Sequence, residues 1–421
     1  MPWKECVAMD QRMRFVLEYE QDERTMAELC RKYGVSRKTG YKWVGRFVVD
    51  GLDGLKDRSR RPLHRPNQVS TEIEELLCGF RAAHPTWGPK KLLAVLQRER
   101  PQRPWPARST VAALLSRRGL AHCRKRRHRV PPQEQPFAAC DGPNALWCAD
   151  FKGWFRTGDG SRCDPLTLTD AYSRLLLRCQ AVPDQAGQTV WPLFEAAFRQ
   201  YGLPAAIRTD NGAPFASRGV GGISRLSLRW IKLGIRPERI EPGQPQQNGR
   251  HERMHLTLKQ ETASPPAGTL RSQQRRFDAF RREFNDIRPH EALGMATPSS
   301  RYVPSPRAYR ECSGDVAYPE GLALRRIGTK GKFKWKGHEV FLGEVLYREV
   351  VGLEALDERY WRAYFGPVAL GILDDHDGRM LTRAEIRRRG LELLPSARRP
   401  PSATLQGASG QEPNVLPMSL D

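Results

Sequence analysis

The sequence contains no long run of apolar residues. No stretch approaches the roughly 20 residues that a helix needs to cross a bilayer. Charged residues such as Lys4, Asp10 and Arg14 interrupt the amino-terminal region, where a signal peptide would carry its apolar segment. We therefore expect no membrane partner and a protein that stays in the cytoplasm.

Paired cysteines are also missing. The 9 cysteines are scattered without a single Cys-x-x-Cys pair, so the spacing gives no indication of a zinc ribbon or a redox pair. An odd number without framework spacing indicates reduced thiols. His122, Cys123 and His128 could be read as a partial zinc site, but their strongly basic surroundings favour a linker.

Acidic residues are scarce relative to basic ones. The chain of 421 residues has 70 Lys and Arg against 47 Asp and Glu, which gives a net charge of +23 and a pI of about 10.0. Such an excess indicates a polyanionic partner, and nucleic acid fits better than a membrane surface. The length suits two to four domains with a sizeable core. We expect a DNA-binding protein associated with the nucleoid.

The first domain, residues 1–62, carries a recognisable pattern. Residues 25–33 have helical apolar spacing, Gly34 marks a turn, and Ser36 is placed to cap a second helix. This is the helix-turn-helix layout, whose second helix enters the major groove of DNA. The alternative is an ordinary helical hairpin with a solvated basic face.

The second helix of this pattern supplies the DNA-contact candidates. Arg37, Lys38 and Lys42 would lie near DNA, while Tyr41 and either Val44 or Phe47 would face the domain core. Residues 63–130 then read as a second helix-turn-helix domain followed by a basic linker, because apolar residues recur at helical spacing before a charged run. The linker residues expected to lie on DNA are Arg124, Lys125, Arg126 and Arg127.

Residues 138–302 alternate strand-like and helix-like segments and predict an α/β core. Asp150 and Asp210 each follow a short apolar run typical of a buried strand, and Glu252 lies in the first turns of a predicted helix. Carboxylates that converge from two strands and a helix can hold two divalent cations about 4 Å apart, the arrangement used in phosphoryl transfer.

The same helix offers a rival interpretation. His251, Glu252 and His255 match the H-E-x-x-H pattern of zinc proteases, in which both histidines bind the metal. Arg253 would put a cation beside that metal, and the preceding segment is a Gln-rich loop without helical signals. The context therefore argues against a protease.

Taken together, several separated motifs give the chain a resemblance to the bacterial insertion-sequence transposases that share the retroviral-integrase catalytic core. The resemblance spans roughly residues 11–300 and rests on Trp147-x-x-Asp150, Thr209-Asp210-Asn211-Gly212, Gln246-x-Asn248-Gly249-x-x-Glu252-Arg253 and Asn285-x-x-Arg288-Pro289-His290. It implies an RNase H-like fold with a catalytic Asp-Asp-Glu triad at Asp150, Asp210 and Glu252, which would bind two Mg²⁺ ions, with Mn²⁺ able to substitute. One departure is the gap of 41 residues between Asp210 and Glu252, longer than the family's usual spacing.

The resemblance implies a function as well. A transposase of this kind performs Mg²⁺-dependent DNA cleavage and strand transfer at the ends of its element. Its partners are double-stranded DNA, both terminal repeats and target, and further copies of itself in a synaptic complex. Lys259 lies two helical turns after Glu252 and could reach a phosphate near the metals. The alternatives are a catalytically idle helix-turn-helix regulator and a nuclease without joining activity.

The carboxy-terminal region completes a multidomain fold class of α-helical helix-turn-helix modules, an α/β RNase H-like catalytic core and a small C-terminal β-barrel. Residues 313–375 alternate aromatic and aliphatic residues with Lys and Arg, which predicts the barrel, and the resemblance implies that it is SH3-like. Residues 376–421 read as a basic and disordered tail.

Overall fold

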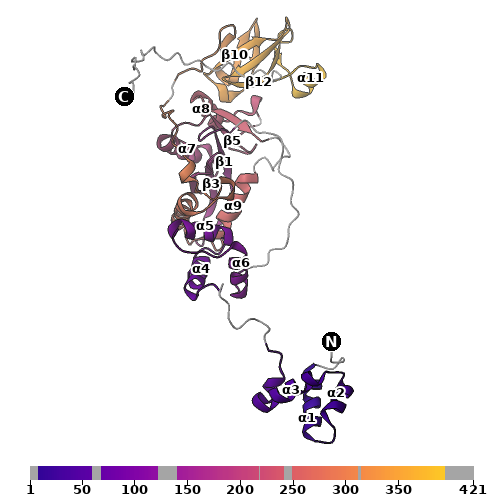
Figure 1. Ribbon diagram of the computed structural model, residues 1–421. Helices are drawn as coiled ribbons and strands as arrows, with labels where there is room; N and C mark the ends of the chain where they lie inside the picture. Colours follow the sequence, from indigo (N-terminus) through magenta and orange to yellow (C-terminus); the bar gives the residue numbers. More distant parts are fainter. Residues whose placement is uncertain are drawn as a thin grey trace, which may run out of the picture. The chain divides into compact units, whose positions relative to one another are not determined.

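The computed structural model describes residues 8–58, 68–121, 140–217, 219–240, 249–311 and 314–393 (Figure 1). The chain divides into two compact units, residues 1–71 and residues 72–421, and each unit is considered by itself.

The first unit is the helix-turn-helix domain that the sequence predicts. Its elements are α1 (Ala8–Glu20), α2 (Met26–Tyr33), α3 (Arg37–Asp50) and η1 (Gly51–Leu55). Thr25 and Glu28 form a capping box at the start of α2, Gly34 ends that helix with a left-handed φ of 66°, and the Ser36 side chain caps α3. These caps and this glycine can be recognised in the sequence, which is why the helix-turn-helix prediction is confirmed.

Close packing of α3 decides which of its residues face the core. A Cβ atom on Gly40 would lie 2.7 Å from the Met26 sulfur and 2.9 Å from the Phe15 ring, so α3 approaches the other helices at a residue without a side chain. Trp43 lies on that face and is buried, whereas Tyr41 is 58% exposed. The expectation that Tyr41 faces the core is therefore wrong, because it lies one residue beyond the contact position.

The second unit begins with three helices, α4 (Thr71–Ala83), α5 (Pro89–Glu99) and α6 (Arg108–Arg117). They pack on the α/β core through the segment between α4 and α5. Trp87 is buried there, with the Arg288 guanidinium 5.6 Å from its ring, and Thr86 and Arg288 both hydrogen-bond to Glu261 of the core. The basic linker residues Arg124, Lys125, Arg126 and Arg127 lie outside the described residues.

A mixed sheet forms the centre of the core. Its strands are β1 (Leu146–Phe151), β2 (Phe155–Arg156), β3 (Arg162–Asp170), β4 (Leu176–Val182), β5 (Ala206–Thr209) and β6 (Arg236–Arg239). β1, β3 and β4 are antiparallel neighbours and β2 pairs with the start of β3, whereas β5 and β6 run parallel to β1. The parallel half brings the carboxyl ends of β1 and β5 to the same edge.

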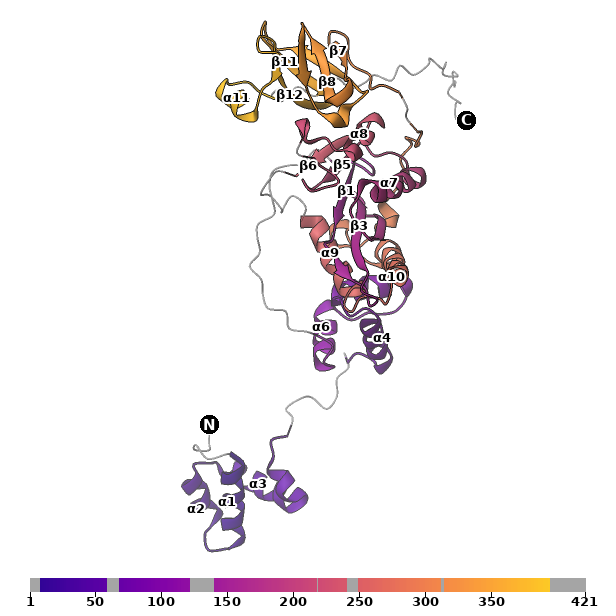
Figure 2. The same ribbon diagram turned by 180° about the vertical axis from the view of Figure 1, so that it is seen from behind.

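Helices cover the sheet on both faces, as an α/β core requires. The helices are α7 (Gly187–Tyr201), α8 (Arg225–Lys232), α9 (Gly249–Thr262) and α10 (Leu270–Arg282), with short turns η2 (Val220–Gly222), η4 (Glu283–Ile287), η5 (Glu291–Leu293) and η6 (Ser299–Arg301). Phe194 and Phe198 of α7 pack in one cluster with Trp147. Met254 of α9 and Phe277 of α10 belong to a second cluster, and Figure 2 shows these two helices together beside β3.

Asn144 joins the segment where the chain enters the α/β core to the segment where the chain leaves it. Its side-chain amide donates to the Val303 carbonyl at 2.8 Å, and its amide oxygen accepts from the Tyr302 hydroxyl at 2.7 Å and from the Trp147 indole at 3.0 Å. The backbone amide of Asn144 also donates to the buried Asp170 carboxylate at 2.7 Å. This clamp closes the core where the chain enters and leaves it.

The carboxy-terminal part is built almost entirely of strands. They are β7 (Ala323–Arg326), β8 (Lys332–Trp335), β9 (His338–Phe341), β10 (Val350–Ala355), β11 (Tyr360–Phe365), β12 (Val368–Asp374) and β13 (Arg379–Met380), with turns η7 (Thr329–Gly331) and η8 (Glu344–Leu346). Five strands form a sheet in the order β13-β12-β11-β10-β7, and β8 and β9 form a hairpin. The β-rich architecture agrees with the prediction, while its SH3-like character stays a prediction.

Ordered structure continues past residue 375, where the sequence suggested a domain limit. β13 and the helix α11 (Arg383–Arg388) follow, and Ile386 of α11 packs against Ile372 of β12. Arg389 binds the buried Asp374 carboxylate at 2.7 Å. The basic residues after 375 therefore include packing partners of the sheet; residues 394–421, expected to be disordered, lie outside the described residues.

Candidate active site

The parallel pairing of β1 with β5 places the two aspartates at matching positions of neighbouring strands. These parallel strands pair Leu146 with Ala206 and Cys148 with Arg208. Continued by two residues, the same register brings Asp210 level with Asp150, and neighbouring strands lie about 4.8 Å apart. Both aspartates are half-buried. Asp210 is held at the strand end by the Gly212 amide, which donates to its carboxylate at 3.1 Å.

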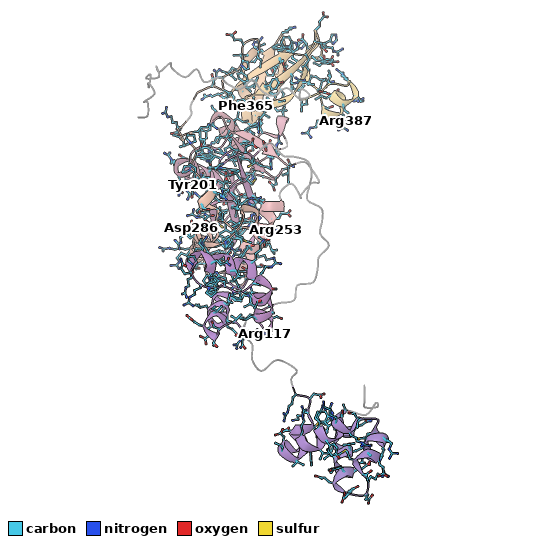
Figure 3. All side chains as sticks on the ribbon, viewed as in Figure 1. Arg117, Tyr201, Arg253, Asp286, Phe365 and Arg387 are labelled. Atoms are coloured by element: carbon cyan, nitrogen blue, oxygen red, sulfur yellow. The ribbon has the colours of Figure 1, made fainter. Side chains whose placement is uncertain are left out.

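Helix α9 presents Glu252 to solvent while it buries the opposite face. His251, Met254, His255 and Leu258 are buried, at the spacing of one helix face. Glu252 is exposed in the first turn, next to Arg253, which Figure 3 labels on the same helix. Lys259 is also exposed and lies seven residues after Glu252, so the two side chains share a face.

Two histidines anchor this helix to the sheet through one hydroxyl group. The Nε2 atoms of His251 and His255 lie 2.6 and 2.7 Å from Oγ1 of Thr167, a buried residue of β3. Thr167 pairs with Asp150 across the sheet and donates to the Asp150 carbonyl at 3.1 Å. Nδ1 of His251 lies 3.2 Å from the Thr169 hydroxyl. The first turn of α9 is thereby fixed beside the strand that carries Asp150.

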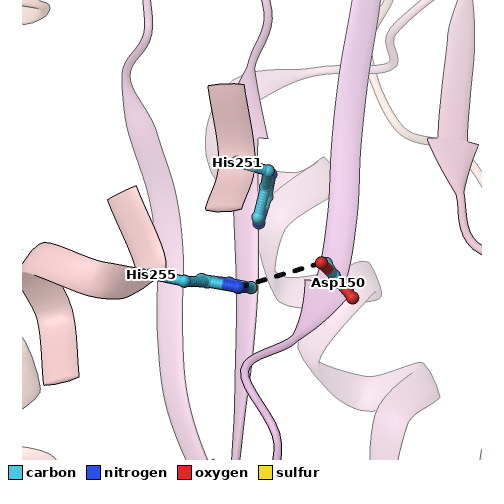
Figure 4. A group of neighbouring side chains, drawn as sticks. All are labelled: Asp150, His251 and His255. Carbon is cyan, nitrogen blue, oxygen red and sulfur yellow. Dashed lines mark ion pairs between the residues drawn. The ribbon is translucent and has the colours of Figure 1, made fainter. Parts of the chain in front are cut away.

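His255 points toward Asp150 (Figure 4). Its Nδ1 lies 3.8 Å from an Asp150 carboxylate oxygen, which is too long for a hydrogen bond. Burial lowers the pKa of His251 to about 3, and burial together with the neighbouring His251 lowers the pKa of His255 to about 2. Both imidazoles are therefore neutral at neutral pH.

One ligand atom from each of Asp150, His251 and His255 lies within 4.8 Å of the others, so this group could hold a metal ion. Among the described residues, Asp210 and Glu252 are not part of this group. Their carboxylate oxygens are of the ligand type that Mg²⁺ prefers. In a zinc-protease site both histidines would turn toward one metal, whereas here both Nε2 atoms turn toward Thr167.

We expect Thr167→Val to destabilise the core. Valine keeps the shape of the side chain but removes the hydroxyl, which leaves two buried imidazole nitrogens without their partner. An unsatisfied buried polar group costs about 1–3 kcal/mol, so the loss should reach about 2 kcal/mol and lower the unfolding temperature of the full chain by several degrees. Thr167→Ser, which keeps the hydroxyl, is the control. Equal unfolding temperatures for all three proteins would contradict the anchoring role.

The later motif around Asn285 has a structural role here. The Asn285 side chain accepts from the Leu176 amide at 2.8 Å and donates to the Leu176 carbonyl at 3.0 Å, which ties η4 to the start of β4. Arg288 is buried and pairs with Glu261 of α9. Glu261 is thus a half-buried partner of this arginine.

Thr167 was missed by the sequence analysis. Its signal is the alternation Thr167-Leu168-Thr169 in a strand, which puts two hydroxyls on one face of the sheet. The histidines were noted for their spacing of four residues, but that spacing alone does not distinguish a metal site from a buried anchor.

The DNA-contact candidates of the first unit are accessible. Arg37, Lys38 and Lys42 are exposed on α3, and the Lys42 ammonium lies 4.3 Å from the Trp43 ring centroid. In the part of the chain that the structure describes, no helix is long and apolar enough to span a membrane.

Family models match most of this architecture. A helix-turn-helix domain model matches residues 11–62 and a homeodomain-like domain model residues 39–115. Two integrase core domain models match residues 141–245 and 233–298. Each candidate carboxylate thus lies inside an integrase core match.

Similar proteins come from insertion elements. The chain is 28% identical over 279 residues to the insertion element IS476 uncharacterized 39.2 kDa protein of Xanthomonas euvesicatoria. This alignment covers 66% of this chain and 78% of the relative. The chain is 26% identical over 246 residues to the IS407 uncharacterized 31.7 kDa protein of Burkholderia multivorans, covering 57% and 85%. Among solved structures, the HTLV-2 integrase catalytic core domain in complex with magnesium aligns with 39% of this chain and 99% of its own, at 15% identity and a TM-score of 0.31.

The helix-turn-helix and homeodomain-like matches precede the integrase core matches along the chain. The chain therefore carries helix-turn-helix domains and an integrase core domain, and it is similar to proteins encoded by bacterial insertion elements.

Proposed function

We propose that this protein cleaves and joins DNA at the ends of an insertion element, with Asp150, Asp210 and Glu252 as the catalytic carboxylates. The pairing register of β1 with β5, which brings the two aspartates level at one sheet edge, carries this proposal. The exposure of Glu252 in the first turn of a helix anchored beside β1 adds the third carboxylate.

The three carboxylates would bind two Mg²⁺ ions, for which Mn²⁺ should substitute. Such a pair of ions activates the attacking oxygen and stabilises the leaving one, so the chain needs no nucleophile of its own. The role of the protein is then to hold three acidic side chains at fixed separation and to position DNA. Lys259, on the exposed face of α9 with Glu252, is suited to bind a DNA phosphate.

The remaining DNA contacts would come from outside the core. We assign recognition of the element ends to Arg37, Lys38 and Lys42 on α3, and phosphate contacts to the linker residues Arg124, Lys125, Arg126 and Arg127. The net charge of +23 supports a polyanionic partner. Because two element ends must be joined to one target, we expect several copies of the chain to act together on double-stranded DNA.

Metal removal tests the proposal. Purified protein is incubated with duplexes cut from the ends that flank its own gene, in Mg²⁺, in Mn²⁺ or in EDTA. We expect nicked and joined products with either metal and intact DNA in EDTA, while the protein still retards the end duplexes in a gel without metal.

The products separate this function from its alternatives. Ends that are bound but never cut with any divalent metal would identify a helix-turn-helix regulator. Cutting without joined products would identify a nuclease. A duplex of unrelated sequence serves as the control, since the proposed function requires preference for the element ends.

A further inference from the structure

The hydrogen bonds around Thr167 assign the proton of His255. A hydroxyl group has one proton to donate, and a carbonyl oxygen can only accept, so all three contacts of Thr167 form together only when it donates to the Asp150 carbonyl at 3.1 Å. In that arrangement Thr167 accepts from the Nε2 atoms of His251 and His255, and both rings carry their proton on Nε2. Nδ1 of each ring is left with a lone pair.

The two rings differ in where that lone pair points. Nδ1 of His251 lies 3.2 Å from the Thr169 hydroxyl, which can donate to it. Nδ1 of His255 faces the carboxylate of Asp150 at 3.8 Å and has no hydrogen bond to any described residue. A lone pair and a carboxylate that face each other in a buried site repel, and a cation between them removes the repulsion.

We propose that His255 Nδ1 is a nitrogen ligand of the divalent metal bound by Asp150, which would make this site prefer Mn²⁺ or another first-row transition ion over Mg²⁺. The inference rests on the proposed role of Asp150 as a metal ligand.

The separation of the two ligand atoms suits this assignment. Metal bonds to imidazole nitrogen and carboxylate oxygen are about 2.0–2.2 Å long, so two ligands of one ion lie roughly 3–4 Å apart, as Nδ1 and the carboxylate oxygen do at 3.8 Å. Metal-binding histidines commonly donate their other ring N–H to an oxygen acceptor, which fixes the ring. Thr167 is such an acceptor for His255 at 2.7 Å. Imidazole nitrogen is a ligand of first-row transition ions, whose affinity for such sites rises from Mn²⁺ to Cu²⁺, whereas Mg²⁺ prefers oxygen ligands alone.

Electron paramagnetic resonance of bound Mn²⁺ tests the inference without DNA or catalysis. We expect the spin-echo spectrum of the full-length protein with Mn²⁺ to contain modulation from a directly bound ¹⁴N nucleus. His255→Asn should remove this modulation and weaken Mn²⁺ binding by at least about 10-fold. Mg²⁺ should compete poorly with Mn²⁺ in the wild type and more effectively in the variant.

His251→Asn is the matched control, one turn away on the same helix face. Since both nitrogens of His251 are engaged by threonine hydroxyls, this variant should keep the ¹⁴N modulation. Asp150→Asn should abolish the Mn²⁺ site. Absence of ¹⁴N modulation in the wild type, its persistence in His255→Asn, or Mn²⁺ binding unaffected by Asp150→Asn would each overturn the inference.

The result is separable from the proposed function. A protein that shows the nitrogen-coupled Mn²⁺ but never cuts element ends would refute the transposase activity and leave the ligand assignment standing. A protein that cuts and joins ends with Mn²⁺ but without nitrogen coupling would refute only the role of His255.

Discussion

Glu252→Gln is expected to lower the rate of end cleavage by about 10³-fold while end binding stays unchanged. Glutamine keeps the size of the side chain and loses the charge that would hold a metal ion. Metal stabilisation of the reacting oxygens contributes several kcal/mol to such reactions, and each 1.4 kcal/mol changes a rate tenfold. Glu252 is exposed, so the substitution should leave the fold intact. Cleavage is measured by product formation over time in Mg²⁺, and binding by gel retardation in EDTA.

A second exposed glutamate provides the control for this substitution. Glu291 pairs with Lys90 on the surface, at 3.2 Å, with 64% of its side chain exposed. Glu291→Gln should cleave at close to the wild-type rate. If Glu252→Gln also cleaved and joined normally, the triad would have to be assigned to other carboxylates.

The combined change of Arg37, Lys38 and Lys42 to alanine should weaken binding to element ends by about 100-fold near physiological salt. Each lysine or arginine that neutralises a phosphate releases counterions, so the logarithm of the binding constant falls with the logarithm of salt concentration by about 0.9 per contact. Loss of three contacts should therefore reduce that slope by about 3. Titrations at several salt concentrations measure both quantities.

The two sets of changes should separate binding from chemistry. The alanine variant keeps all three carboxylates, so its residual Mg²⁺-dependent cutting of concentrated DNA should persist, while Glu252→Gln should bind normally and not cut. Lys32→Ala is the control, because Lys32 is a basic residue of the same domain that pairs with Glu18 at 2.6 Å. Unchanged affinity and salt slope in the alanine variant would remove α3 from the DNA interface.

Local signals in the sequence were sufficient for the helix-turn-helix domain and for the two strands that precede the aspartates. Caps such as Ser36 and glycines such as Gly34 act through backbone bonds within a few residues, so they can be read directly. Short apolar runs predicted β1 and β5, and the structure adds their parallel pairing, which brings Asp210 level with Asp150.

Features that depend on contacts between distant segments could not be predicted from the sequence. The partnership of Thr167 with His251 and His255 joins residues more than 80 positions apart. No pattern along the chain shows that one hydroxyl serves both rings. The burial of Glu261 with Arg288, and the packing of α11 past residue 375, likewise arise only when separate elements meet.

The Asn144 clamp has a mechanical consequence. A chain anchored to DNA through domains on both sides of its core is pulled at the two points where it enters and leaves that core. Here these points are joined by the bonds from Asn144 to Val303 and Tyr302. Tension applied between residues 144 and 303 would therefore be borne by this short link before it reached the paired strands that hold Asp150 and Asp210.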